Sequence, residues 1–165
     1  MNHYDAAVLV VTTVATNDCQ LNEVSVTFAR FYIDLHYGGL QIMHHIVVVD
    51  DTPALADLVM RMLTRYGYSV RTLNGGLQLI EYMRQHRPAL VLLDVGLPVK
   101  DGWTLIREIR MQPDLAHIPV IAITAHAAEE DRQRAFSAGY TNYISKPFDV
   151  QDLLQMVRGY VPSAV

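Results

Sequence analysis

Three aspartates stand at the ends of two apolar, strand-like stretches. Asp50 and Asp51 directly follow residues 45–49, and Asp94 directly follows residues 89–93. If both stretches are strands of a parallel sheet ordered 2-1-3-4-5, their carboxyl ends are neighbours at one edge of the sheet. Carboxylates so close together repel, and Mg²⁺ is the usual counter-ion where a few protein oxygens and several waters complete its shell. The spacing therefore predicts a Mg²⁺ site at this edge.

A hydroxyl group and an ammonium group end two further apolar stretches. Thr124 ends one of them, and Lys146, one of only two lysines in the chain, ends the next. A carboxylate nucleophile, a divalent metal, a hydroxyl donor and an ammonium group together suit phosphoryl transfer, which depends mainly on positioning and charge neutralisation. The residue types therefore predict phosphoryl transfer at this edge of the sheet.

The chain from His44 onward supplies the elements that would position these groups. Apolar strand-like stretches alternate with amphipathic helix-like stretches, which is typical of an α/β fold with a parallel sheet. We expect Thr52 to cap the first helix and Asp149 to cap the last. The expected strands cover residues 45–49, 69–72, 89–93, 119–123 and 142–144, and the expected helices cover 53–66, 77–85, 103–110, 127–137 and 150–161.

Residues 1–43 differ from the rest of the chain, with four acidic residues, one arginine and no clean period of a helix or strand. We predict that this segment is a loosely ordered N-terminal extension and that residues 44–165 form the compact domain. Met43 would be a natural start for that domain. Residues 1–42 would then be dispensable for its function.

Composition argues against several classes of function. The net charge of −4 and the isoelectric point near 5.9 give no basic surface for direct nucleic-acid binding. The N-terminal apolar run at residues 6–11 is far shorter than the roughly 20 residues of a membrane span, and no basic residue precedes it as in a signal peptide. Cys19 is the only cysteine, which suits a reducing compartment. We expect a cytoplasmic protein without a membrane anchor.

Four motifs, taken in this order, resemble the receiver domains of two-component response regulators. They are VVVDD at 47–51, LLDVGLPVKDGW at 92–103, ITA at 123–125 and YISKPF at 143–148. The resemblance covers about residues 44–161. It implies that residues 44–165 are a receiver domain with a doubly wound, five-stranded parallel sheet of flavodoxin-like order 2-1-3-4-5.

The resemblance also implies a role for each matching residue of the site. Asp94 would accept the phosphoryl group, and Lys146 would pair with it. Asp51, Asp94 and the backbone carbonyl of Gly96 would bind Mg²⁺, while Asp50 would help through the water shell of the metal. Gly96 has no side chain where many members of the family carry a polar group, so the lifetime of the phosphoryl group stays open.

A switch is implied as well. Thr124 would donate a hydrogen bond to the phosphoryl group, the rotamer of Tyr143 would follow Thr124, and the peptide bond before Pro147 would be cis. The added negative charge would pull the Thr124 loop inward. The surface expected to change consists of the fourth helix, the fifth strand and the fifth helix of the domain.

Other conspicuous residues have simpler interpretations. Asp101-Gly102 is expected to form a turn, and Gly75-Gly76 a turn or a helix entry. His44 and His45 point to opposite faces of a strand, so we expect solvent exposure and no metal site. The charged residues of 129–134 are typical of a solvated helix face. The resemblance to receiver domains implies a partner surface there as the second interpretation, and it makes His126, two residues after Thr124, a further candidate for tuning the phosphoryl lifetime.

The sequence thus predicts a stand-alone response regulator rather than a conventional enzyme. A histidine kinase or a histidine phosphotransfer protein would phosphorylate it on Asp94, it would promote its own phosphorylation and dephosphorylation, and it would control a separate effector protein; phosphorylation-dependent homodimerisation stays open. One alternative is a pseudo-receiver that binds partners without phosphorylation, although the site residues are intact. The other is an aspartyl-phosphate phosphatase, which would carry an aspartate at position 96 instead of Gly96.

Overall fold

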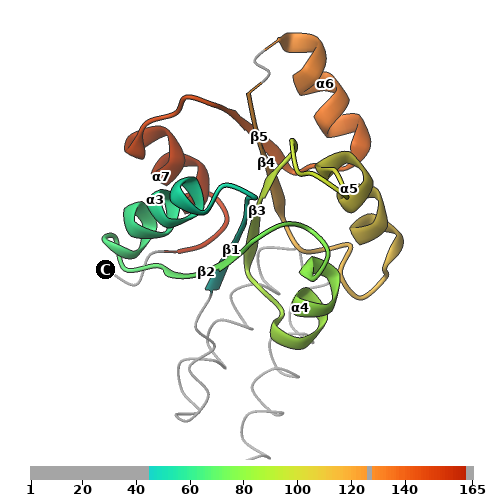
Figure 1. Ribbon diagram of the computed structural model, residues 1–165, viewed down its shortest axis with the longest axis horizontal. Helices are drawn as coiled ribbons and strands as arrows, with labels where there is room; N and C mark the ends of the chain where they lie inside the picture. The colour runs from blue at the N-terminus through green and yellow to red at the C-terminus, as the bar shows by residue number, and fades with distance from the viewer. Residues whose placement is uncertain (1–44, 126–127, 163–165) are drawn as a thin grey trace, which may run out of the picture. The chain divides into compact units, whose positions relative to one another are not determined.

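The computed structural model describes residues 45–125 and 128–162. One sheet of five parallel strands in the order β2-β1-β3-β4-β5 forms its centre, as predicted (Figure 1). The predicted position of Asp94 is slightly corrected, because it is the last residue of its strand, whereas Thr124 ends its strand as predicted. The strands are β1 (His45–Val49), β2 (Ser69–Leu73), β3 (Leu90–Asp94), β4 (Val120–Thr124) and β5 (Asn142–Ser145).

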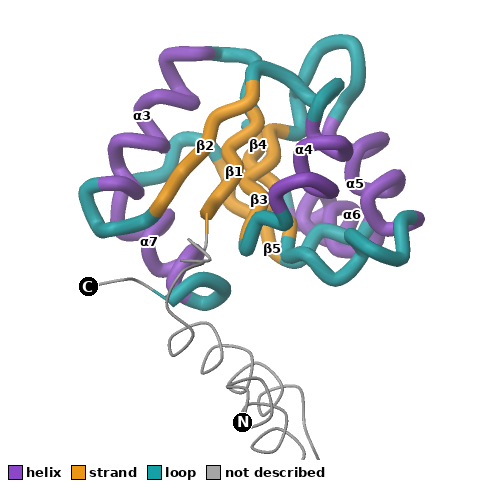
Figure 2. The backbone as a smooth tube through the Cα atoms, turned by 90° about the horizontal axis from the view of Figure 1, so that it is seen from below, coloured by secondary structure: helices purple, strands orange, loops and turns teal. Residues whose placement is uncertain are grey.

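Helices cover both faces of the sheet. Helices α3 and α7 lie on one face, and α4, α5 and α6 lie on the other, as both views show (Figures 1 and 2). The second predicted helix begins two residues later than expected, so Leu77 lies in the preceding loop and is exposed. The helices are α3 (Pro53–Thr64), α4 (Leu79–His86), α5 (Gly102–Met111), α6 (Glu129–Ala138) and α7 (Val150–Arg158).

The central strands are apolar along nearly their whole length because both of their faces are covered. Val47, Val49 and Leu93 point into the core under α4 and α5, whereas Ile46 and Leu92 point into the core under α3 and α7. Since successive side chains of a strand alternate between faces, each strand contributes to both cores. The three central strands, β1, β3 and β4, therefore carry polar residues only at their ends.

The two predicted helix caps differ in the structure. Asp149 caps α7, since its carboxylate accepts from the N–H of Asp152 at 2.9 Å and the side chain of Asp152 accepts in return from the N–H of Asp149. Thr52 occupies the cap position of α3, but its side chain makes no capping hydrogen bond. Its own N–H instead donates to Asp50 Oδ1 at 2.8 Å.

The expectation of a simple turn at Asp101-Gly102 is wrong. Asp101 is the N-cap of α5 and accepts from the N–H of Thr104 at 2.7 Å, and Gly102 is the first helical residue. Aspartate followed by glycine is common in turns, but an acceptor side chain before a helix also satisfies its first N–H groups. A Cβ atom on Gly102 would lie 2.7 Å from Val95 Cα, so only glycine fits here.

Strand β5 lies at an edge of the sheet and pairs only with β4. The N–H of Lys146, just after β5, bonds to the carbonyl of Thr124 on β4. Because backbone groups alternate in direction, the N–H of Tyr143, three residues earlier, faces the open edge. It donates to Oδ1 of Asn142 at 2.9 Å. The amide nitrogen of Asn142 donates in turn to the hydroxyl of Tyr160 at 3.1 Å.

The expectation of an exposed His45 is also wrong. Its side chain is half-buried, and its ring lies against Tyr82 and His86 of α4, with centroid distances of 5.9 and 6.3 Å. The predictions for residues 1–43, His44 and His126 lie outside the described residues. Within residues 45–125 and 128–162, no helix has the length and apolar character that a membrane crossing requires.

Candidate functional site

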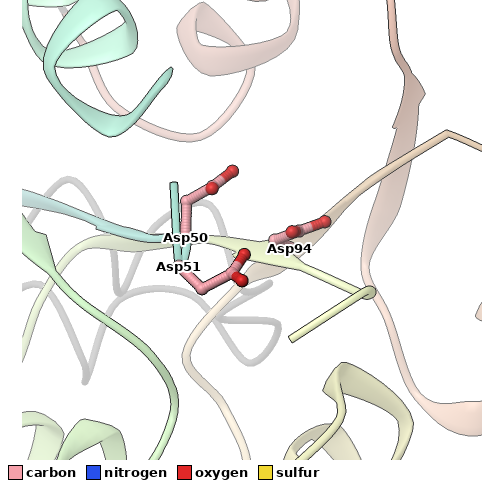
Figure 3. A group of neighbouring side chains, drawn as sticks. All are labelled: Asp50, Asp51 and Asp94. Atoms are coloured by element: carbon pink, nitrogen blue, oxygen red, sulfur yellow. The ribbon is translucent and has the colours of Figure 1, made fainter. Parts of the chain in front are cut away.

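Asp50, Asp51 and Asp94 lie together at the carboxyl ends of β1 and β3. Oxygen atoms of the three carboxylates lie within 4.8 Å of one another. Figure 3 shows the two residues that follow β1 beside Asp94 at the end of β3. Asp50 is 3% exposed and Asp94 is 7% exposed, whereas Asp51 is exposed to solvent. The predicted convergence of the three side chains is thus found in the structure.

Lys146 supplies a positive charge to the two buried carboxylates. Its Nζ lies 3.1 Å from Asp50 Oδ2 and 3.2 Å from Asp94 Oδ1. One ammonium group does not balance three carboxylates, so the cluster retains a formal charge of about −2 when all four groups are ionised. Oxygen ligands with this excess charge fit a hard divalent cation such as Mg²⁺.

Gly96 lies on the loop that follows Asp94. Its N–H donates to Asp94 Oδ1 at 3.2 Å. A Cβ atom on Gly96 would lie 3.8 Å from each carboxylate oxygen of Asp94, so the absence of a side chain leaves space beside the carboxylate. The role of the Gly96 carbonyl as a metal ligand stays a prediction.

The two predicted switch residues lie on adjacent strands. Thr124 is buried at the end of β4, and its carbonyl accepts from the N–H of Lys146 at 2.6 Å. Tyr143 on β5 packs against the core under α4 and α5. Its hydroxyl is buried without a hydrogen-bond partner among the described residues, and burial, followed by the nearby charge of Asp131, raises its pKa. The peptide bond between Lys146 and Pro147 is cis, as predicted.

Sequence reasoning missed a cluster behind the loop of Asp94. Tyr140 is 3% exposed, and its ring meets Trp103 edge-on at a centroid distance of 5.8 Å. The guanidinium of Arg134 lies 4.6 Å from the centre of the Trp103 ring. These residues come from three separate segments and follow no common spacing, so no pattern in the sequence joins them.

The fold and the acid cluster together define a class of protein, the receiver domain of two-component signalling. The chain matches the family model of the response regulator receiver domain over residues 46–158. The match covers more than half of the chain, which therefore belongs to this family. Receiver domains are signalling phosphoacceptors rather than conventional enzymes.

Individual relatives share the domain at moderate identity. The chain is 37% identical over 116 residues to the DNA-binding dual master transcriptional regulator RpaA of Synechocystis sp., a match that covers 70% of this chain and 48% of RpaA. This chain thus spans about half the length of that relative. It is 32% identical over 119 residues to the polar-differentiation response regulator DivK of Brucella anthropi, covering 72% of this chain and 97% of DivK.

A solved structure of similar fold contains a metal. The receiver domain of the sensor histidine kinase PA1611 from Pseudomonas aeruginosa PAO1 was determined with a magnesium ion coordinated in its active-site cleft. It is 34% identical in sequence and has a TM-score of 0.65, and the match covers 70% of this chain and 95% of that domain. The likeness confirms the flavodoxin-like receiver fold.

Proposed function

We propose that this chain is a response regulator that accepts a phosphoryl group on Asp94 from the phosphohistidine of a kinase or a phosphotransfer protein. A carboxylate oxygen of Asp94 forms a bond to phosphorus while the bond from phosphorus to the donor nitrogen breaks. The donor imidazole leaves with that electron pair. The departing imidazole takes up one proton from water, so the products are an aspartyl phosphate on the receiver and a neutral histidine on the donor.

The observation that carries this proposal is the contact of Lys146 with both buried carboxylates beside an exposed third one. Lys146 is positioned to neutralise phosphoryl oxygens because its Nζ already lies 3.2 Å from Asp94 Oδ1. Thr124, at the end of the adjacent strand, would donate its hydroxyl to the phosphoryl group.

Asp51, Asp94 and the carbonyl of Gly96 would hold Mg²⁺, and Asp50 would act through the water shell of the ion. When bound, the ion would neutralise charge on the phosphoryl oxygens. The carboxylate separation within 4.8 Å and the excess negative charge of the cluster support this assignment.

Output would pass to a separate protein through the surface formed by α6, β5 and α7. A groove lies between β5 and α7, with Tyr143, Phe148, Met156 and Tyr160 among its lining residues. Because Tyr143 lines this groove and packs against the core as well, a change of its rotamer would alter the groove directly. RpaA is named a DNA-binding regulator. We do not propose DNA binding for this chain, because its net charge of −4 gives no basic surface to neutralise phosphates.

The test uses acetyl phosphate as a small phosphodonor and intact mass as the readout. Wild-type protein with Mg²⁺ should gain the mass of one phosphoryl group, and Asp94→Ala or added chelator should abolish the gain. Asp114→Asn is the matched control, because Asp114 is an exposed aspartate paired with Arg87 outside the acid cluster. It should be phosphorylated like the wild type.

Two other outcomes would contradict the proposal. Mg²⁺ binding without any adduct would favour the pseudo-receiver. Steady release of inorganic phosphate from many turnovers of diverse phosphomonoesters would instead favour the phosphatase, which Gly96 argues against.

A further inference from the structure

The hydroxyl of Tyr140 lies against the backbone that carries the phosphoacceptor. A Cβ atom on Gly102 would meet Tyr140 Oη at 2.6 Å and the carbonyl oxygen of Asp94 at 2.8 Å, so these two atoms flank the same point. The N–H of Gly102 donates to the carbonyl of Val95 at 3.0 Å, which closes the loop between Asp94 and α5. Tyr140 therefore supports that loop from the side of α6.

The Tyr140 hydroxyl makes no hydrogen bond with any described residue. A buried hydroxyl without a partner is unfavourable, and phenylalanine would fill the same space without that penalty. Tyr140 immediately follows Gly139, the residue that ends α6. A displacement of the loop beside Asp94 would thus move Tyr140 and, with it, the C-terminal end of this helix.

Trp103 and Arg134 extend the contact along the helix. Trp103 is the second residue of α5, and its ring packs edge-on against Tyr140. Arg134 lies in the middle of α6 and places its guanidinium over the Trp103 ring, 4.6 Å from the ring centre. A guanidinium over an indole ring is an attractive contact whose strength depends on the relative position of the two groups.

Helix α6 is otherwise held weakly. Ala135 is the only one of its residues that is buried, whereas α5 and α7 each bury three or more. Its cap residue, Ala128, has no side chain that could bond to the first turn. A helix with so little buried surface adopts the position that its few contacts select.

We propose that Tyr140 and Trp103 are positioning residues that couple the backbone beside Asp94 to helix α6, with Arg134 as the contact on the helix. This inference rests on the proposed phosphorylation of Asp94. The phosphoryl group adds bulk and charge at Asp94, the loop through Gly102 adjusts, and the packed rings transmit the adjustment because close-packed side chains yield in discrete steps. By linkage, if phosphorylation changes the free energy of the contact between Arg134 and Trp103, removal of that contact changes the affinity of the site for a phosphoryl group by the corresponding factor.

Trp103 is the only tryptophan of the chain, so tryptophan emission reports on the surroundings of this one residue. The experiment titrates the full chain with beryllofluoride, a phosphoryl mimic, in the presence of Mg²⁺ and follows Trp103 emission. Arg134→Gln is compared with Arg132→Gln, which removes the same charge from the same helix but whose side chain contacts Phe136 and Glu129 instead. Arg134→Lys keeps a cation at the position. Adduct formation with acetyl phosphate is measured separately by intact mass.

We expect beryllofluoride to change the emission of the wild type and Arg134→Gln to shift the midpoint roughly 2- to 5-fold, with Arg132→Gln unchanged and Arg134→Lys largely restored. Equal midpoints for Arg134→Gln and Arg132→Gln would overturn the coupling, as would an adduct formed without any change in emission. In both cases the proposed function would survive. Absence of the adduct in the wild type would overturn the proposed function and the coupling together.

Discussion

Asp51 differs from the other two carboxylates of the acid cluster. Asp50 and Asp94 are buried and share Lys146, whereas Asp51 is exposed and has no ion pair among the described residues. Its charge is therefore the one that a bound metal would balance most directly. The stability of the protein should reflect this difference between otherwise identical side chains.

Mg²⁺ at ten times its dissociation constant should stabilise the wild type by about 1.4 kcal/mol, because it binds the folded cluster only. Asp51→Asn should abolish this gain, and without Mg²⁺ it should unfold at the same or slightly higher urea concentration because one repelling charge is gone. Urea unfolding with Mg²⁺ and with chelator measures both effects. Asp57→Asn serves as the control, because Asp57 is a half-buried aspartate that is paired with Arg61 on α3. A full Mg²⁺ effect in Asp51→Asn would exclude Asp51 as a ligand.

Tyr140→Phe should raise the free energy of unfolding by about 1 kcal/mol at neutral pH, because it removes a buried hydroxyl that lacks a partner. Tyr160→Phe is the matched comparison, since the Tyr160 hydroxyl accepts a hydrogen bond from Asn142 and its loss should not stabilise. Urea unfolding of the two variants distinguishes them. A loss of stability in Tyr140→Phe would mean that the hydroxyl has a favourable contact.

Tyr140 should also make the stability of the protein depend on pH. Burial, and then the charges of Asp101 and Asp94, raise the pKa of Tyr140 far above its ordinary value of 10.0. The unfolded chain therefore releases this proton first as the pH rises above about 10, and stability falls from there upward. Tyr140→Phe should lose less stability than the wild type between neutral pH and pH values above 10. Parallel losses in the two proteins would mean that Tyr140 does not contribute.

At the scale of elements, the residue type at the start of a helix does not by itself determine whether that residue caps the helix. Asp149 and Thr52 are both good cap residues and both stand at the N-cap, but only Asp149 makes the capping bonds. Thr52 follows two residues of the acid cluster, and its backbone N–H is bonded to Asp50. The chemistry of the site thus determines how α3 begins.

Asp149→Ala should lower the free energy of unfolding by about 1 kcal/mol, because the N–H of Asp152 in the first turn of α7 loses the carboxylate that accepts its hydrogen bond. Thr52→Ala should change it much less, because no side-chain bond is lost. Chemical denaturation of both variants provides the comparison. Equal losses would show that Thr52 contributes in some other way.

The sequence predicts the elements and the acid cluster well, because both depend on local patterns. Apolar strands that end in Asp94 and Thr124, or just before Asp50, indicate the sheet and its functional edge together. The left-handed backbone of Val99, at φ 65° with the side chain 90% exposed, could not be predicted, because β-branched residues rarely adopt it. The contact between Tyr140 and Trp103 depends on packing between distant segments, which local periodicity does not encode.

At the scale of the whole molecule, the domain contains its own core. Buried side chains from Ile46 to Val161 fill both faces of the sheet, so the described part of the chain has the apolar packing that a stable domain needs. The first described strand, β1, begins at His45, and the predicted start of the domain at Met43 stays a prediction. The dispensability of residues 1–42 stays a prediction.

A variant that lacks residues 1–42 should fold and should gain one phosphoryl group with acetyl phosphate and Mg²⁺, because the whole acid cluster lies within the retained chain. Circular dichroism and intact mass test the two properties. The full-length protein provides the reference values of both. Loss of folding or of the adduct would mean that residues 1–42 belong to the working domain.

The hydrogen bond from the backbone N–H of Tyr143 to the side chain of Asn142 has a consequence for behaviour in concentrated solution. An exposed sheet edge with free N–H groups recruits strands from other molecules and so starts aggregation. Here the amide side chain of Asn142 occupies the N–H of Tyr143, and Tyr160 holds the amide in place. This hydrogen bond should therefore disfavour the addition of further strands to the sheet at β5. The same strand must stay accessible if partners are to contact Tyr143.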